Sequence, residues 1–223
     1  LEGLIHFGVI EEAADISAET LSHKNFDPRL HNVVRSEAFK SLTSEQIELI
    51  HTAYTRAIDA LRKNITPLGF SACSLTDNTF NTTDENYRSI WARDGAITVI
   101  NSLSVEDPDI RACQKATLDT LLEHTSPRGQ VPSNVRIDSN TPAYSGVGEI
   151  ASIDSGLWLV IAFYPYIPQT RDYTFLRDWI EDIDKIMNWL EAHDSNYDSL
   201  LEIPEAGDWM DLFGRSYNVL YDE

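Results

Sequence analysis

The chain has 223 residues and a formal net charge of −19, with 17 Lys and Arg against 36 Asp and Glu. Apolar residues make up 42% and aromatic residues 10%, which is enough for a packed core and argues against a disordered chain. The acidic balance and the lack of a basic run argue against nucleic acid and anionic membranes as partners.

Three further features bear on the cellular location. No stretch of about 20 apolar residues could span a bilayer, and the first residues do not resemble a signal peptide. Two cysteines, Cys73 and Cys113, are too few for a disulfide framework and favour a reducing compartment. We therefore expect a cytoplasmic protein without a membrane partner.

The first helix predicted along the chain follows Thr43, whereas the structure of residues 1–42 is left open. Thr43 and Gln46 form a capping box. Apolar residues then recur at steps of three and four: Ile47, Ile50, Tyr54, Ile58 and Leu61. Residues 64–83 are rich in Pro, Gly, Ser, Thr and Asn, which predicts a loop or short strands.

Two more amphipathic helices are predicted further on. Asp107-Pro108 is a typical helix start, with proline at the first helical position. The apolar stripe of this helix is Ile110, Cys113, Thr117 and Leu121. Residues 127–148 are expected to form a long loop, and Thr170 or Asp172 begins the next helix. The apolar face of that helix is Phe175, Trp179, Ile183, Ile186 and Leu190.

Two other segments, residues 92–103 and 155–164, are apolar on nearly all sides. A helix that is hydrophobic all round is buried. We therefore expect buried helices to alternate with amphipathic ones, linked by polar loops. No long strand competes with this pattern, so the predicted fold class is all-α.

A repeat of aspartate and tryptophan runs through the second half of the chain. Each of three aspartates has a tryptophan close by: Asp94 with Trp91, Asp154 with Trp158, and Asp211 with Trp209. The aspartates are 60 and 57 residues apart, a regular spacing that indicates stacked helical hairpins. If the buried helices point the same way, their N-terminal ends surround one site, as in a toroid of hairpins with a pocket at one mouth.

Carboxylates grouped with tryptophans are suited to binding sugars. Carboxylates accept hydrogen bonds from hydroxyl groups, indole rings stack on the apolar faces of pyranoses, and arginine donates to ring substituents. Glycoside hydrolysis also requires one carboxylic acid to protonate the leaving oxygen and a second carboxylate to act on water or the anomeric carbon. The repeat therefore favours a carbohydrate site.

Four segments, in this order, resemble known glycosidases. Residues 87–96, which contain Tyr-x-x-x-Trp-x-Arg-Asp-Gly, resemble a segment of glucoamylases and related six-hairpin enzymes. Residues 129–134 are similar, with one extra residue, to the Gly-x-x-Pro-Asn loop of glycogen-debranching enzymes in their amylo-α-1,6-glucosidase part. Residues 153–158 resemble the Asp-x-x-Leu-Trp segment that these enzymes share with neutral invertases, and residues 207–211 resemble their Trp-Met-Asp segment. The chain thus resembles the six-hairpin glycoside hydrolases, closest to the debranching and glucoamylase-like families.

This resemblance implies roles for particular residues. Arg93 and Asp94 match the pair that binds the hydroxyl groups of the terminal sugar at the cleavage subsite. Tyr87 and Trp91 match aromatic residues that line this subsite, and Asp154 matches the general acid. Gln130, Trp209 and Asp211 match further substrate-binding segments.

The resemblance also implies a fold and a reaction. The fold is an (α/α)6 barrel, and the reaction is hydrolysis of a terminal α-glucosyl unit with inversion, an enzyme activity of carbohydrate metabolism. It implies an α-glucoside as the substrate and neither a cofactor nor a metal. Only about half of the six hairpins fit into residues 43–223, so we expect these to be the N-terminal part of the barrel, with its C-terminal part missing. The family's catalytic base, a glutamate nearer the C-terminus, matches no residue here.

Several alternatives remain open from the sequence. In the first alternative, Asp154 is only a helix cap. In the second, Glu149 is the acid in its place. In the third, Arg93 and Asp94 form a structural ion pair. Three alternatives concern the function of the whole protein. It is a sucrose-cleaving, invertase-like hydrolase, a non-catalytic carbohydrate-binding or scaffold protein, or an unrelated helical toroid without sugar affinity.

Overall fold

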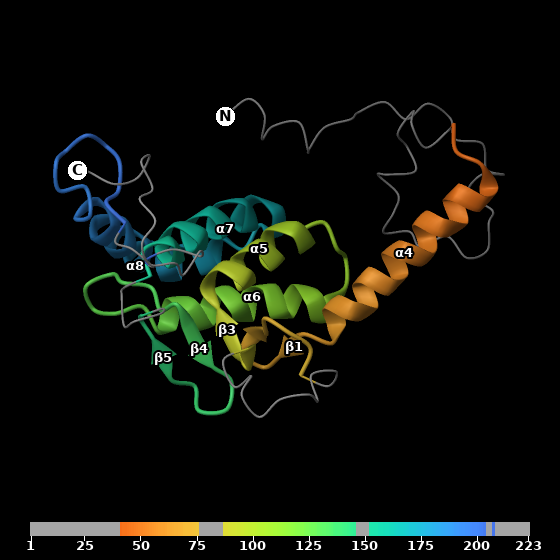
Figure 1. Cartoon of the computed structure of the whole chain (residues 1–223), viewed down its shortest axis with the longest axis horizontal. Helices are drawn as coiled ribbons and strands as arrows, with labels where there is room; N and C mark the ends of the chain where they lie inside the picture. The colour runs from red at the N-terminus through yellow and green to blue at the C-terminus, as the bar shows by residue number, and fades with distance from the viewer. Residues whose placement is uncertain (1–40, 76–86, 146–151, 204–206, 208–223) are drawn as a thin grey trace. The chain divides into compact units, whose positions relative to one another are not determined.

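A computed structural model describes residues 41–75, 87–145, 152–203 and 207 of the protein (Figure 1). Helices make up 56% of the residues described, and the strands between them are short. The chain divides into two compact units between Asp59 and Ala60. Within the described ranges, no helix combines the length and the apolar character needed to cross a membrane.

Helix α4 (Ser44–Arg62) begins as the sequence predicts. The Thr43 N–H donates to Gln46 Oε1 at 2.8 Å, and the Gln46 N–H donates to Thr43 Oγ1 at 3.3 Å. These reciprocal bonds are the predicted capping box, in which each residue satisfies a backbone donor of the first turn. The predicted helix is therefore confirmed, and residues 1–40 of the segment left open lie outside the described residues.

Helix α6 (Pro108–Glu123) also starts where predicted. Asp107 Oδ1 accepts from the N–H groups of Asp109 at 3.0 Å and Ile110 at 3.1 Å. Proline at the first helical position costs no hydrogen bond there, because that N–H has no partner within the helix. The predicted apolar stripe is confirmed, since all four of its members are buried: Ile110, Cys113, Thr117 and Leu121.

A β-hairpin of strands β1 (Ile65–Thr66) and β2 (Gly69–Phe70) packs on α6. The Phe70 N–H donates to Thr117 Oγ1 at 2.9 Å. Gly69 has a φ of +129°, and a Cβ at this position would lie 2.6 Å from the Thr117 Cα. Only glycine fits both the backbone conformation and the close approach. These strands agree with the short strands predicted as one possibility for this segment.

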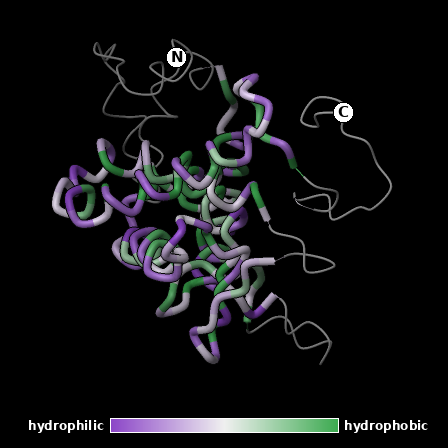
Figure 2. Tube along the Cα trace, turned by 90° about the vertical axis from the view of Figure 1, so that its left-hand side faces the viewer, coloured by the Kyte–Doolittle hydropathy of each residue, from purple (hydrophilic) through white to green (hydrophobic). Residues whose placement is uncertain are grey.

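Two helical hairpins form the main core. Helix α5 (Ala92–Ser102) packs on α6 and on α7 (Asp154–Thr170), which in turn packs on α8 (Tyr173–Glu191) (Figure 1). Figure 2 shows that hydrophobic and hydrophilic residues are interspersed along the described chain. The described part of the protein is thus predominantly helical, with helical hairpins side by side as the repeat predicts.

The prediction of a helix buried on all sides is only half correct for α7. Leu159 and Ala162 are fully buried, but Ile161 is 51% and Tyr164 is 72% exposed. Among the residues that the structure describes, the helices in contact with α7 are mainly α5 and α8. Two neighbours leave part of a helix open to solvent, and the apolar sequence alone does not reveal this. The helix also extends beyond the predicted end, to Thr170.

Helix α8 is capped by Asp172, the second of the two predicted starting points. Asp172 Oδ1 accepts from the Phe175 N–H at 3.0 Å, and Arg171 ends α7 in the left-handed conformation with a φ of +58°. Phe175, Ile186 and Leu190 of the predicted apolar face are buried. The cap and the left-handed residue together allow the chain to reverse within a very short link between α7 and α8.

Residues 127–148 were predicted to be a loop, and this is wrong for part of the segment. Strands β4 (Asn134–Arg136) and β5 (Pro142–Ala143) pair with each other, and β4 pairs with β3 (Ser89–Trp91), all antiparallel. Ile90 lies opposite Val135, and both side chains are fully buried. Strands of two or three residues are too short to produce an alternating pattern in the sequence, and burial of this pair stabilises them.

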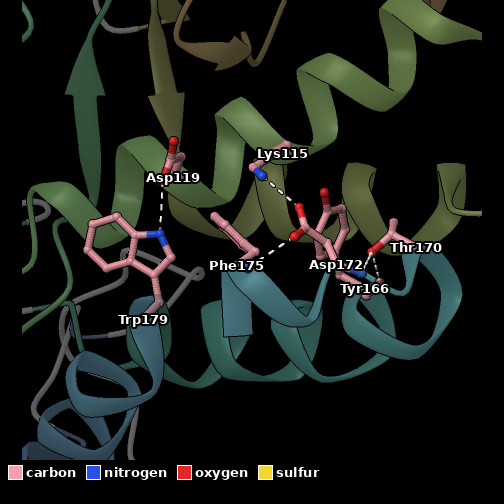
Figure 3. A network of polar contacts seen from close by, with 7 residues as sticks. All are labelled: Lys115, Asp119, Tyr166, Thr170, Asp172, Phe175 and Trp179. Atoms are coloured by element: carbon pink, nitrogen blue, oxygen red, sulfur yellow. Dashed lines mark hydrogen bonds and ion pairs between the residues drawn. The ribbon is translucent and has the colours of Figure 1, made fainter. Parts of the chain in front are cut away.

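Polar contacts join α6 to α8, as Figure 3 shows. Lys115 Nζ donates to Asp172 Oδ2 at 2.6 Å and lies 4.9 Å from the centre of the Phe175 ring. Trp179 Nε1 donates to Asp119 Oδ1 at 2.9 Å. The Lys115 hydrogen bond lowers the pKa of Asp172 below its ordinary 3.8 and raises the pKa of Lys115 above 10.5. The ion pair therefore stabilises the fold fully between these two pH values.

We expect Lys115→Met to reduce the free energy of unfolding by about 1 kcal/mol at pH 7, a small value because both partners are partly exposed. The difference from the wild type should shrink as the pH falls below 3.8, where protonation of Asp172 removes the attraction. Urea unfolding across this pH range measures it. Lys185→Met is the control, because Lys185 pairs with Asp182 three residues away within α8 and so joins no two elements. An equal loss of unfolding free energy in both variants would contradict a stabilising role of the Lys115–Asp172 ion pair.

Candidate active site

Three of the four glycosidase-like segments meet at the first turns of α5 and α7. The Ala92 N–H, at the start of α5, donates to Ser133 O at 3.0 Å and so joins the first segment to the second. Arg93 Nη1 then donates to Asp154 Oδ2 at 2.9 Å, joining the first segment to the third. The N-terminal ends of α5 and α7 therefore lie side by side, as the toroid hypothesis requires for these two helices.

The fourth segment reaches the same place through its first residue. The Ile153 N–H, directly before Asp154, donates to Gly207 O at 3.0 Å. Trp209 and Asp211, which follow in this segment, lie outside the described residues, as does Glu149, the alternative acid. Hydrogen bonds thus connect all four segments: the third contains Asp154, the first and fourth bond to Asp154 or its neighbour Ile153, and the second bonds to Ala92 of the first.

Asp154 is the most enclosed carboxylate at this junction. It is the first residue of α7 and is 7% exposed. Its Oδ2 accepts from Arg93, and its Oδ1 accepts from Ser152 Oγ at 2.8 Å. Both oxygens therefore accept a hydrogen bond, and the position in the first turn favours a negative charge through the helix dipole.

The alternative that Asp154 only caps α7 is wrong. The N-cap of α7 is Ile153, which has no side-chain capping bond. Asp154 already has its backbone inside the helix, and its carboxylate is directed to two side chains from other positions in the chain, Arg93 and Ser152. Its burial is thus explained by these contacts and not by a capping role.

Arg93 and Asp94 differ in their surroundings. In the described part of the chain, the ion pair of Arg93 is with Asp154, and 29% of the Arg93 side chain is exposed. Asp94, the next residue of α5, is exposed to solvent. The predicted alternative of an ion pair between these two neighbours is replaced by a pair that spans two helices. Asp94 is accordingly available to an external hydroxyl group.

The predicted aromatic residues lie just before α5. Tyr87 is 53% exposed, and Trp91, the last residue of β3, is partly buried. Trp158, one turn into α7 from Asp154, is also partly buried. A partly exposed aromatic ring is the type of side chain that stacks on the apolar face of a sugar.

Gln130 is connected to Asp154 through one loop carbonyl. Gln130 Nε2 donates to Tyr144 O at 3.1 Å, and the Ser152 N–H points to the same oxygen at 3.5 Å. Ser152 in turn donates to Asp154. One N–H of the Gln130 side-chain amide is thus bonded within the protein, to the same oxygen as the Ser152 N–H.

Three residues at the junction, Ser152, Ser155 and Tyr144, are not predicted from the sequence. Ser155 Oγ donates to Ser152 Oγ at 3.1 Å, which completes a chain of hydroxyl groups that ends on Asp154. Two serines within two residues of a candidate acid were a visible indication, since hydroxyl groups are common carboxylate donors. The contact of Tyr144 through its backbone oxygen has no signature in the sequence.

No group of three or more His, Cys, Asp or Glu side chains gathers as a metal site within the described ranges. Cys113 is buried, and burial raises the pKa of its thiol to about 11, so it is held in the neutral form. The chemistry available at the junction is that of a carboxylate, a guanidinium group, hydroxyl groups and aromatic rings. No protein-family model and no curated protein matches the chain.

Proposed function

We propose that the protein is a glycoside hydrolase that cleaves a terminal α-glucosyl unit with inversion, and that Asp154 is its general acid. The observation that carries this proposal is the meeting of four glycosidase-like segments around one buried carboxylate. These segments are separated by up to about 120 residues in the sequence. We propose further that the helical hairpins α5–α6 and α7–α8 belong to an (α/α)6 barrel.

The proposed reaction assigns a role to each group. Arg93 and Asp94 bind hydroxyl groups of the terminal sugar, while Tyr87 and Trp91 contact its ring. Asp154 protonates the leaving oxygen. A base outside this chain activates a water molecule on the opposite face of the sugar, about 6.5–9.5 Å from the acid in an inverting enzyme. Trp209 and Asp211 add further sugar contacts in this proposal.

Asp154 has to release Arg93 before it acts as an acid. Oδ2 accepts from Arg93 Nη1 at 2.9 Å, so this oxygen already has a donor. Sugar hydroxyl groups offer Arg93 new acceptors. Transfer of the guanidinium group to these hydroxyls would free Oδ2 for the glycosidic oxygen.

A second candidate is a non-catalytic carbohydrate-binding protein. The observation that favours it is that both oxygens of Asp154 already accept hydrogen bonds, from Arg93 and Ser152. A carboxylate held in this way is a good acceptor for sugar hydroxyls and needs no proton to bind them. This protein would bind sugars without turnover.

The product of the full gene that encodes this chain, assayed with maltose, isomaltose and sucrose, tests the proposal. We expect glucose release from the two α-glucosides. Preferred cleavage of sucrose would instead support an invertase-like hydrolase. Calorimetric binding of maltose without glucose release would support the binding protein, and absence of both binding and turnover with every sugar would contradict any carbohydrate function.

A further inference from the structure

Two serine hydroxyl groups form a directed chain behind Asp154. Ser155 is 2% exposed, and its Oγ donates to Ser152 Oγ at 3.1 Å. Ser152 Oγ donates to Asp154 Oδ1 at 2.8 Å. A serine hydroxyl has one proton, so Ser152 can donate to the carboxylate while its lone pairs accept from Ser155. Consecutive bonds of this kind polarise and strengthen one another.

The backbone of Ser152 is held in place from the other side. Its N–H points to Tyr144 O at 3.5 Å, the same oxygen that accepts from Gln130 Nε2. The Tyr144 hydroxyl group donates to His124 O at 2.7 Å, at the end of α6. The backbone of Ser152 is therefore linked, through the Tyr144 oxygen, to residues outside α7.

We propose that Ser152 is a positioning residue that holds Asp154 Oδ1 while Oδ2 exchanges Arg93 for the glycosidic oxygen. This inference rests on the proposed function. The terminal torsion of aspartate is broad, so the carboxyl plane is poorly defined once Arg93 moves to the sugar. The hydrogen bond from the Ser152 hydroxyl group then keeps Oδ2 directed at the leaving oxygen. Small errors in this geometry greatly lower the rate of the chemical step.

Steady-state hydrolysis of maltose by variants of the full gene product tests this. Ser152→Ala should lower kcat by about 10-fold, because the acid is misaligned, and leave KM within about twofold. Ser152→Thr, which keeps a hydroxyl group, should restore kcat to within about threefold of the wild type. Ser155→Ala, which removes only the second bond of the chain, should lower kcat by a smaller factor and serves if Ser152→Ala does not fold.

Ser71→Ala is the matched control. Ser71 is also buried, and its hydroxyl oxygen lies within hydrogen-bond distance of the backbone oxygens of Asn64 and Cys73, in the β1–β2 region. Its kcat should equal that of the wild type. Wild-type kcat in both Ser152→Ala and Ser155→Ala, or failure of threonine to restore a lost kcat, would overturn the positioning role alone. An inactive wild type would instead overturn the proposed function and this inference with it.

Discussion

Asp154→Asn is expected to lower kcat for α-glucoside hydrolysis by about 10²–10⁴-fold, the usual contribution of a general acid. Asparagine has nearly the same shape, and its amide oxygen can still accept from Arg93, so the site should keep its geometry. The amide has no acidic proton to give to the leaving oxygen. Initial rates of glucose release measure the effect, with circular dichroism to verify the fold.

Asp109→Asn provides the matched control for this variant. Asp109 also lies in the first turn of a helix, α6, but it is exposed. Both variants therefore lose one carboxylate near a helix N-terminus, but Asp109→Asn leaves the candidate site unchanged. A rate for Asp154→Asn within about threefold of the control would contradict the role of Asp154 as the general acid.

The second large effect is expected at Gly129, the first residue of the debranching-like loop. Its φ is +93°, and a Cβ here would lie 2.1 Å from Lys185 O and 2.5 Å from Lys185 C. These are backbone atoms of α8, so they cannot rotate away. We expect Gly129→Ala to reduce the free energy of unfolding by about 3 kcal/mol or more, from the positive φ together with overpacking.

Gly156→Ala is the control for the loss of a glycine. Gly156 lies in α7, where an added Cβ would meet the Ile186 and Leu190 side chains at 3.4 Å, and its φ is not in the left-handed region. The better helix propensity of alanine should offset the tighter packing and leave stability within about 1 kcal/mol. Urea unfolding of both variants compares them. Equal stabilities would contradict the close approach of the loop to α8.

Features that depend on neighbouring residues were predictable from the sequence. The capping box of Thr43 and Gln46 and the Asp107 cap of α6 are short-range hydrogen bonds, so residue type and spacing are sufficient to identify them. The first-turn positions of Asp94 and Asp154 followed from the same local patterns.

Features that depend on distant residues were not predictable in the same way. The ion pair of Arg93 joins it to a residue 61 positions away, in preference to its neighbour. The β3–β4 pairing is stabilised by burial of Ile90 against Val135, which no local pattern reports. The exposure of Tyr164 depends on which helices contact α7. The apolar sequence of α7 does not predict which helices these are.

The configuration of the sugar first released tests the central claim most directly. Proton NMR during hydrolysis of maltose by the full gene product distinguishes α-glucose from β-glucose before the two anomers equilibrate. An inverting enzyme with Asp154 as its acid releases β-glucose first from the α-linked non-reducing unit, and Asp154→Asn abolishes this signal. Release of α-glucose from that unit, or β-glucose release unchanged in Asp154→Asn, would contradict the account.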